Sequence, residues 1–291
     1  MNDAFTLSEP LPQLDDPVLI VMLTGWIDAS TAAAGAMAAL HQDCATRLLG
    51  TFDPDAFIDY RARRPTMELR DGINTKLVWS EIELRVGRDA AGRDVVTLSG
   101  PEPDSQWRRF AQSVSSLATQ LGVTSMVVLG AYPFASPHTR PARLSCSSPS
   151  ADVVANVPYL KNSVDVPAGM GAVLEHALTD AGISALGLWV QVPHYVSTMA
   201  HPEASVALID GLQQVAGITV EAATLRSDAT RQRTRLDELV AGNDEHAAMV
   251  RQLEEMYDTS AQQTLSLGNA QIPSGDELAA ELERFLREQD N

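Results

Sequence analysis

Two loops of this chain carry the side chains best suited to chemistry. One, AYPFASPHTRP, contains His138, which can carry a proton near neutral pH, and Arg140, which can hold an anion. The other, QVPHYVS, contains His194 and Tyr195. Each loop follows an apolar run of strand length, so parallel strands would bring both loops to one edge of a sheet. These four residues are candidates for a ligand or partner contact. The alternative is a proline-stiffened turn with incidental polar residues.

A third loop, GWIDAST, joins an apolar run to the start of a helix and contains Asp28 and Ser30. Free backbone N–H groups at such a position can cradle an anion. The loop lacks the glycines of a phosphate-binding motif, however, and Asp and Ser are common helix caps. We therefore favour helix capping for Asp28 and Ser30 and keep them as ligand candidates of second rank.

The usual catalytic and metal-binding motifs are missing from the sequence. It contains no H-E-x-x-H, no paired C-x-x-C, no Asp-rich calcium loop, no G-x-S-x-G and no Walker A loop. A Cys, His, Asp arrangement can be drawn from Cys146, but with two cysteines and six histidines such sets are easy to draw. Cys146 is better interpreted as a small buried residue. We expect no metal and no cofactor, and we assign no catalytic residue.

The elements that position these loops follow an α/β order. Buried strands are predicted at Pro17 to Leu23, Ser125 to Ala131 and Ala185 to Val192, with helices between them. The prediction is an α/β fold with a mainly parallel sheet and helices on both faces. Alternating polar and apolar residues from Glu81 to Val86, followed by a turn, predict a β-hairpin insertion at about residues 76–99. Such a hairpin either pads the sheet edge or reaches a neighbouring subunit.

After residue 225 the sequence predicts only helices, so we divide the chain into an α/β core, 1–225, and an acidic helical extension, 226–291. Helices are expected at Ser227 to Ala241 and Asn243 to Tyr257, and a last one begins at Ser274 after a polar linker. Their apolar stripes need a partner surface. We expect the extension to pack over the carboxyl edge of the sheet as a lid.

Composition narrows the function classes. The chain has 291 residues, with 21 Lys and Arg against 38 Asp and Glu, which gives a formal net charge of −17. Such a surface repels phosphate, which argues against nucleic-acid binding and against anionic membranes. The start of the sequence shows no signal peptide, no apolar run is long enough to span a bilayer, and the two cysteines form no redox pattern. We expect a cytoplasmic location.

Several segments together resemble the proteasome assembly chaperone 2 family, in its bacterial branch with a helical tail. They are FDPDAFIDYRARRP (52–65), LSGPEPDSQWRRF (98–110), PHTRP (137–141), PAGMGAVLEHA (167–177) and LWVQVPHY (188–195). The resemblance covers roughly Pro17 to Leu225. It implies a core similar to purine nucleoside phosphorylases and related hydrolases, in proteins whose better-known relatives chaperone proteasome assembly as oligomers. Family members that engage the proteasome are associated with a C-terminal hydrophobic-Tyr-any tripeptide. This sequence ends in Gln289, Asp290 and Asn291, so docking by that route is not expected.

Two functions follow from these observations. The first, which we favour, is a non-enzymatic assembly or protein-interaction role as a homo-oligomer with a protein partner, with the hairpin as one means of contact. The alternative is a small-molecule binding protein or a hydrolase- or phosphorylase-like enzyme. Its cleft would be formed by the loops at Gly25, Pro137 and Pro193, beneath the helical extension. Fold resemblance alone does not decide between them.

Overall fold

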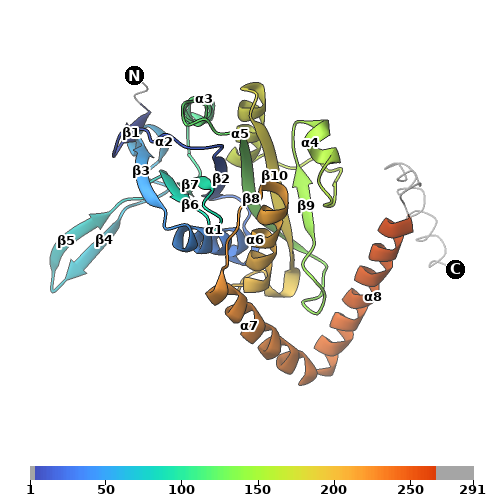
Figure 1. Ribbon diagram of the computed structural model, residues 1–291. Coiled ribbons are helices and arrows are strands. Elements are labelled where there is room, and N and C mark those ends of the chain that lie inside the picture. The colour runs from blue at the N-terminus through green and yellow to red at the C-terminus, as the bar shows by residue number, and fades with distance from the viewer. Residues whose placement is uncertain (1–3, 267–291) are drawn as a thin grey trace.

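The computed structural model describes residues 4–266, and an eight-stranded sheet forms its centre (Figure 1). In spatial order the strands are β1 (Phe5–Leu7), β3 (Arg47–Phe52), β6 (Glu83–Arg88), β7 (Asp94–Pro101), β2 (Val18–Thr24), β8 (Ser125–Phe134), β10 (Ser184–Pro193) and β9 (Leu144–Ser147).

The four central strands, β7, β2, β8 and β10, run parallel, and the outer strands pair antiparallel. Strands β2, β8 and β10 are largely apolar, which suits strands that helices bury on both faces. All four end at the same side of the sheet, which we call the carboxyl edge. The expected α/β fold with a parallel centre is confirmed.

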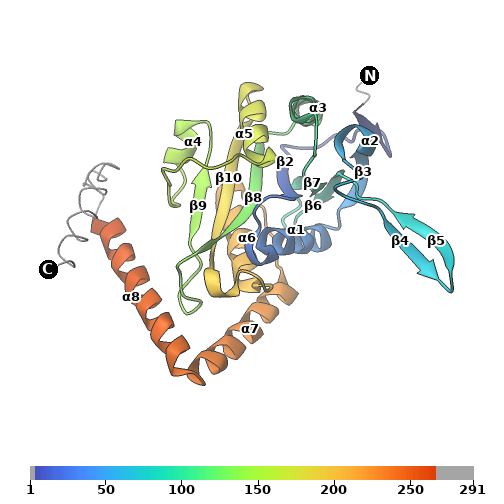
Figure 2. The ribbon, with the colours of Figure 1, turned by 180° about the vertical axis from the view of Figure 1, so that it is seen from behind.

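Two pairs of helices cover the sheet. Helices α3 (Trp107–Gln120) and α5 (Met170–Asp180) bury one face, and α1 (Ala32–Asp43) and α6 (Pro202–Ala216) bury the other (Figures 1 and 2). These helices pack on the sheet through apolar stripes. In α3, for example, the buried residues Phe110, Val114 and Leu117 recur at helical spacing and form one such stripe. We call the two faces the α5 face and the α6 face. Short helices α2 (Pro54–Phe57) and α4 (Ala151–Ala155) lie in the connections.

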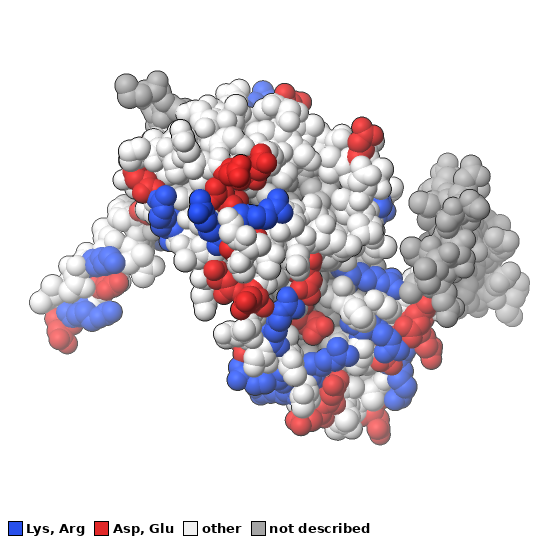
Figure 3. Space-filling model, viewed as in Figure 1, with Lys and Arg blue, Asp and Glu red and all other residues white. Residues whose placement is uncertain are grey.

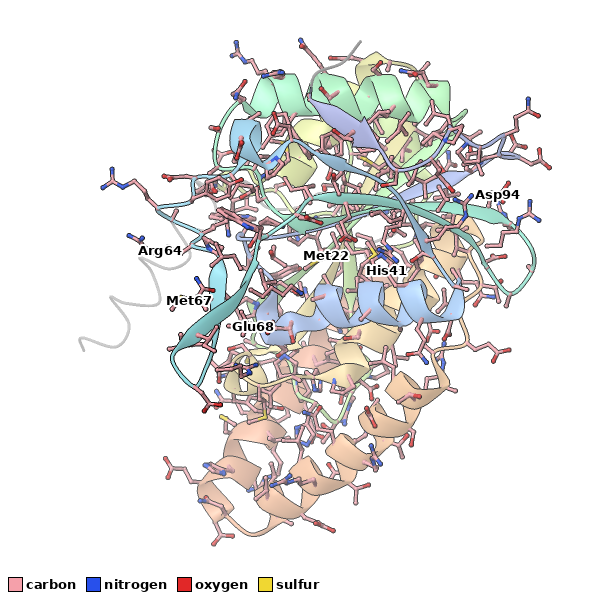
Figure 4. The ribbon with its side chains drawn as sticks, turned by 90° about the vertical axis from the view of Figure 1, so that its left-hand side faces the viewer. Met22, His41, Arg64, Met67, Glu68 and Asp94 are labelled. Carbon is pink, nitrogen blue, oxygen red and sulfur yellow. The ribbon has the colours of Figure 1, made fainter. Side chains whose placement is uncertain are left out.

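A separate hairpin, β4 (Thr66–Arg70) and β5 (Ile73–Val78), projects from the core (Figure 1). In Figure 4, Arg64 lies near its base and Met67 and Glu68 lie on β4, while Met22 and His41 lie between α1 and the sheet. This corrects the sequence prediction. The hairpin expected at about residues 76–99 exists as β6 and β7, but both strands lie inside the sheet, and the projecting insertion is β4–β5.

The described chain ends in two helices, α7 (Ala223–Ala241) and α8 (Asp244–Ser266), which form a V-shaped arm below the sheet (Figures 1 and 2). Figure 3 shows acidic and basic side chains intermixed on this α7–α8 arm. Helix α8 continues past Tyr257, so the first part of the expected linker is helical. The helix expected from Ser274 lies outside the described residues. Within residues 4–266 no helix is long and apolar enough to cross a membrane.

Candidate functional site

Asp28 closes the first turn of α1. Its Oδ1 accepts a hydrogen bond from the backbone N–H of Ala33 (2.8 Å), and its Oδ2 accepts one from Ala34 (3.1 Å). Burial raises the pKa of this carboxyl, and the same backbone N–H groups oppose that rise. Both carboxylate oxygens are thus engaged by the helix start, so Asp28 acts as a helix cap.

Ser30 joins two of the candidate loops. Its Oγ donates to the carbonyl of Val196 (2.8 Å), and its backbone N–H donates to the carbonyl of Ser197 (2.8 Å). Ser30 adopts a left-handed conformation (φ 59°), which turns the chain sharply into α1. The GWIDAST and QVPHYVS loops therefore meet at the carboxyl edge, as expected, and they are bonded to each other.

His138 and Tyr195 also meet, and a third group completes the cluster. The Tyr195 hydroxyl lies 2.7 Å from both the backbone N and the Nδ1 of His138, and His138 Nε2 lies 3.2 Å from Oδ1 of Asp237 on α7. Because the backbone N–H donates to the hydroxyl oxygen, the hydroxyl hydrogen is left for Nδ1, which places the ring proton on Nε2, facing Asp237. Desolvation lowers the pKa of His138, and burial raises that of Tyr195 to about 12. With only 3 % of its surface exposed, His138 joins the core to the arm.

Arg140 binds helix α8 and not an external anion. Its guanidinium contacts Oε1 of Glu254 (2.9 Å) and both carboxylate oxygens of Asp258 (2.8 and 3.0 Å). The neighbouring Arg143 stacks 3.7 Å from the ring centroid of Tyr257 and donates to its carbonyl (2.7 Å). The loop after β8 is thus fastened to α8 by several charged and aromatic contacts.

The other sequence candidates stay apart from this cluster. His194 is exposed, and its ring centroid lies 5.4 Å from that of Tyr195. Cys146 packs with Val157 and Leu186 on the α6 face, and burial raises its pKa, which disfavours the nucleophilic thiolate. No cluster of three potential metal ligands occurs among residues 4–260. The candidate loops converge, but their polar groups bind one another and the arm.

A sequence profile of the PAC2 family matches residues 22–240 of this chain. The chain belongs to the PAC2 family. The resemblance drawn from the sequence is therefore confirmed. A search of curated proteins returned no match.

Solved structures resemble this PAC2 protein over most of its length. A Corynebacterium glutamicum protein of unknown function is 31% identical, with a TM-score of 0.83 over 90% of this chain and 99% of its own. A Streptomyces avermitilis PAC2 family protein is 33% identical, with a TM-score of 0.73 over 81% and 100%. A Mycobacterium tuberculosis proteasome-assembly chaperone homologue is 32% identical, with a TM-score of 0.74 over 80% and 99%.

The partners of the candidate residues were not predictable from local sequence. Asp237, Glu254 and Tyr257 lie about a hundred residues after the loop that they bind, and nothing in their own helices marks them. In the basic cluster RARRP (61–65), only Arg63 forms an ion pair among the described residues, and its partner is Asp104 (3.1 Å).

The β4–β5 hairpin of this PAC2 protein carries an unusual number of exposed apolar side chains. They are Met67 (50 % exposed), Leu69 (50 %), Ile73 (65 %), Leu77 (43 %) and Val78 (41 %), followed by Trp79 (45 %). Met67 and Leu77 lie directly opposite each other in the register of the two strands. A concentrated exposed apolar surface of this kind is typical of a protein contact.

Proposed function

We propose that this PAC2 protein is a cytoplasmic assembly or interaction protein that acts through protein contacts, as a homo-oligomer, and not by catalysis. Its family and its 32% identical relative, a proteasome-assembly chaperone homologue, support a chaperone-like role. The contacts of the polar residues in the candidate loops also support a non-catalytic role. Asp28, His138 and Arg140 are used as structural contacts, which leaves the phosphorylase-like alternative without a free proton carrier or anion clamp at those positions.

The β4–β5 hairpin is the observation that carries the proposal. Its two strands pair only with each other within the described chain, so each has an open outer edge. An isolated two-stranded hairpin is marginally stable in water. A partner chain would cover the apolar side chains and pair with an open edge, and both gains favour association. The partner surface in a homo-oligomer would be a second copy of this chain.

The α7–α8 arm has a supporting role in this proposal, as a lid fixed over the loop at the carboxyl edge. His138 with Asp237 and Arg140 with Glu254 and Asp258 hold it in place. Partly exposed ion pairs of this type contribute little individually, but the buried His138 contact adds specificity. The lid would keep the loops after β8 and β10 from contacting partners, so that recognition is concentrated on the hairpin.

A pull-down with matched variants tests the function. Met67→Ser combined with Leu77→Ser removes apolar surface from the hairpin, and Leu239→Ser combined with Met256→Ser removes the same residue types from the arm, where they are also exposed (59 % and 47 %). We expect an untagged copy of this chain to co-purify with tagged wild type and with the tagged arm variant, but not with the tagged hairpin variant. Recovery of the tagged wild type without the untagged copy, or retention of the untagged copy by the hairpin variant, would contradict the proposal.

A further inference from the structure

A row of polar side chains lies on the α5 face near the carboxyl edge, away from the loops bound by the arm. The register of β8, β10 and β9 places its members on one face of the sheet, and α5 contributes one more. The row consists of Tyr132, Gln191, Ser145, Trp189, Ser147 and Glu175. None of these residues contacts the hairpin, and only Tyr132 and Gln191 belong to the candidate loops as predicted from sequence.

Gln191 is the central member, because its amide is buried and mostly unused. Only 4 % of the residue is exposed, its Nε2 donates to the Tyr132 hydroxyl (3.1 Å), and its Oε1 has no hydrogen-bond partner. A primary amide has two N–H donors and a carbonyl acceptor. One donor and the acceptor are therefore left, and a buried amide oxygen without a partner destabilises the folded protein. A group offering one acceptor and one donor side by side would satisfy both.

Tyr132 and Ser145 extend this hydrogen-bonding edge. The Tyr132 hydroxyl accepts from Gln191 and, more weakly, from Asn162 (3.4 Å), and it lies 3.1 Å from Oγ of Ser145. The two hydroxyls share one hydrogen between them, so one O–H of the pair is still available as a donor. Ser145 is buried, which places this donor beside the amide of Gln191 and out of bulk water.

Trp189 supplies a flat apolar surface next to that edge. A Cβ atom at Gly130 would clash with the six-membered ring of the indole, and one at Gly187 would lie 2.9 Å from its Nε1. The indole therefore spans two glycines on neighbouring strands and lies against the sheet. Its opposite face points away from the sheet and can stack on a planar group. At the far end of the indole, Ser147 donates to Glu175 (3.2 Å).

The chain segment above this row is only lightly attached. Residues 161–168 are exposed throughout, with Val164 and Val166 at 69 % and 66 %, and none of their backbone groups forms a hydrogen bond to another described residue. Figure 2 shows the segment between α4 and α5 crossing β10 and β8 on this side. A small molecule can reach the row by displacing this segment, which breaks two side-chain hydrogen bonds among the described residues, from Asn162 to the Tyr132 hydroxyl (3.4 Å) and from Lys161 to the carbonyl of Val157 (2.7 Å).

We propose that this row binds a small, uncharged, planar molecule with an amide edge, meaning an N–H next to a C=O as in the lactam form of a nucleobase. The edge pairs with the Gln191 amide, and the ring stacks on Trp189. The row contains no basic side chain, so it offers nothing to balance an anionic ligand. This inference is independent of the protein-contact function, because it uses other residues on another surface.

Hypoxanthine and purine form a matched pair of probes, since only hypoxanthine has an N–H beside a ring carbonyl. The measurement is an NMR titration of the full-length protein that follows the indole N–H signal of Trp189, assigned with Trp189→Phe. We expect hypoxanthine to shift this signal and to bind about tenfold or more tightly than purine, as the loss of a buried hydrogen-bonded edge implies. Gln191→Leu should remove the difference between the probes, and Gln120→Leu, on the exposed end of α3, should leave it unchanged.

Several results would overturn the inference. Equal affinity of the two probes would show stacking without recognition of the amide edge, and no shift with millimolar hypoxanthine would show that the row only holds the fold together. If Gln191→Leu fails to fold, the comparison of the two probes on the unaltered protein still decides. Hypoxanthine binding with an unchanged Trp189 signal would place the ligand elsewhere.

Discussion

Glu175 gives the sharpest quantitative test of the packing on the α5 face. Its carboxyl lies between α5 and the sheet, and only 5 % of the residue is exposed. The hydroxyl of Ser147 donates a hydrogen bond to this carboxyl. Desolvation raises the pKa of Glu175 from 4.5 to about 7, and the Ser147 hydrogen bond only partly opposes the rise. A rise of this size corresponds to about 3 kcal/mol of lost stability once the carboxyl is ionised.

The sign of the pH dependence follows from the raised pKa. Below pH 4.5 the carboxyl is protonated in both the folded and the unfolded chain, so its contribution to stability is fully present. As the pH rises through 7 the folded protein must ionise a buried group, and that contribution is lost. Glu175→Gln keeps the shape of the protonated form and removes the ionisation. The variant should therefore match the wild type near pH 4.5 and exceed its free energy of unfolding by about 3 kcal/mol at pH 8.

The assay is urea denaturation of the wild type, Glu175→Gln and the control Glu255→Gln at several pH values between 4.5 and 8. Glu255 lies on the exposed side of α8, so its replacement should change stability little and without the same trend. Comparing variants at each pH cancels the titration of all other groups. A stability difference that does not grow with pH, or a Glu175→Gln protein less stable than the wild type at pH 8, would refute the reasoning.

Three further replacements test other contacts by thermal or urea denaturation. Asp28→Ala should cost about 1 kcal/mol because α1 loses its cap, and an unchanged stability would contradict the capping role. Arg140→Ala should lower stability only slightly, since the ion pairs are partly exposed, yet should speed proteolysis within α8; equal cleavage rates would show that Arg140 does not hold the arm. Gly130→Ala should cost about 1–3 kcal/mol because its Cβ meets the indole of Trp189, and a neutral effect would show that the indole lies elsewhere.

The parts of the fold that the sequence predicted are those with a strong local pattern. Strands β2, β8 and β10 are continuous apolar runs, and α3 and α5 carry apolar stripes at helical spacing. Other elements lack such a pattern. Strand β9 (LSCS) is only four residues long, which is too short for its alternation to stand out. In the β4–β5 hairpin, strand β4 (TMELR) alternates but β5 (INTKLV) does not, and both strands are largely exposed.

For the site, sequence predicted which loops meet but not what they do. Because the strands before the two loops are parallel neighbours, the loops with His138 and Tyr195 lie at the same edge of the sheet. The sequence could therefore place these two residues near each other. Their use depends on Asp237 in a distant helix, which only tertiary packing reveals. Glu175 was missed for a similar reason. It is a carboxylate beside the exposed His176 on a helix, and its burial follows from how α5 crosses the sheet.

The central claim, that the β4–β5 hairpin mediates protein contact in a homo-oligomer, is tested most directly by light scattering coupled to size-exclusion chromatography. One chain has a mass of 31.3 kDa. The account predicts that the wild type and the arm variant Leu239→Ser with Met256→Ser elute as a defined multiple of this mass. It predicts that the hairpin variant Met67→Ser with Leu77→Ser elutes at the single-chain mass with unchanged circular dichroism. A wild type of single-chain mass, or a hairpin variant that stays oligomeric, would contradict it.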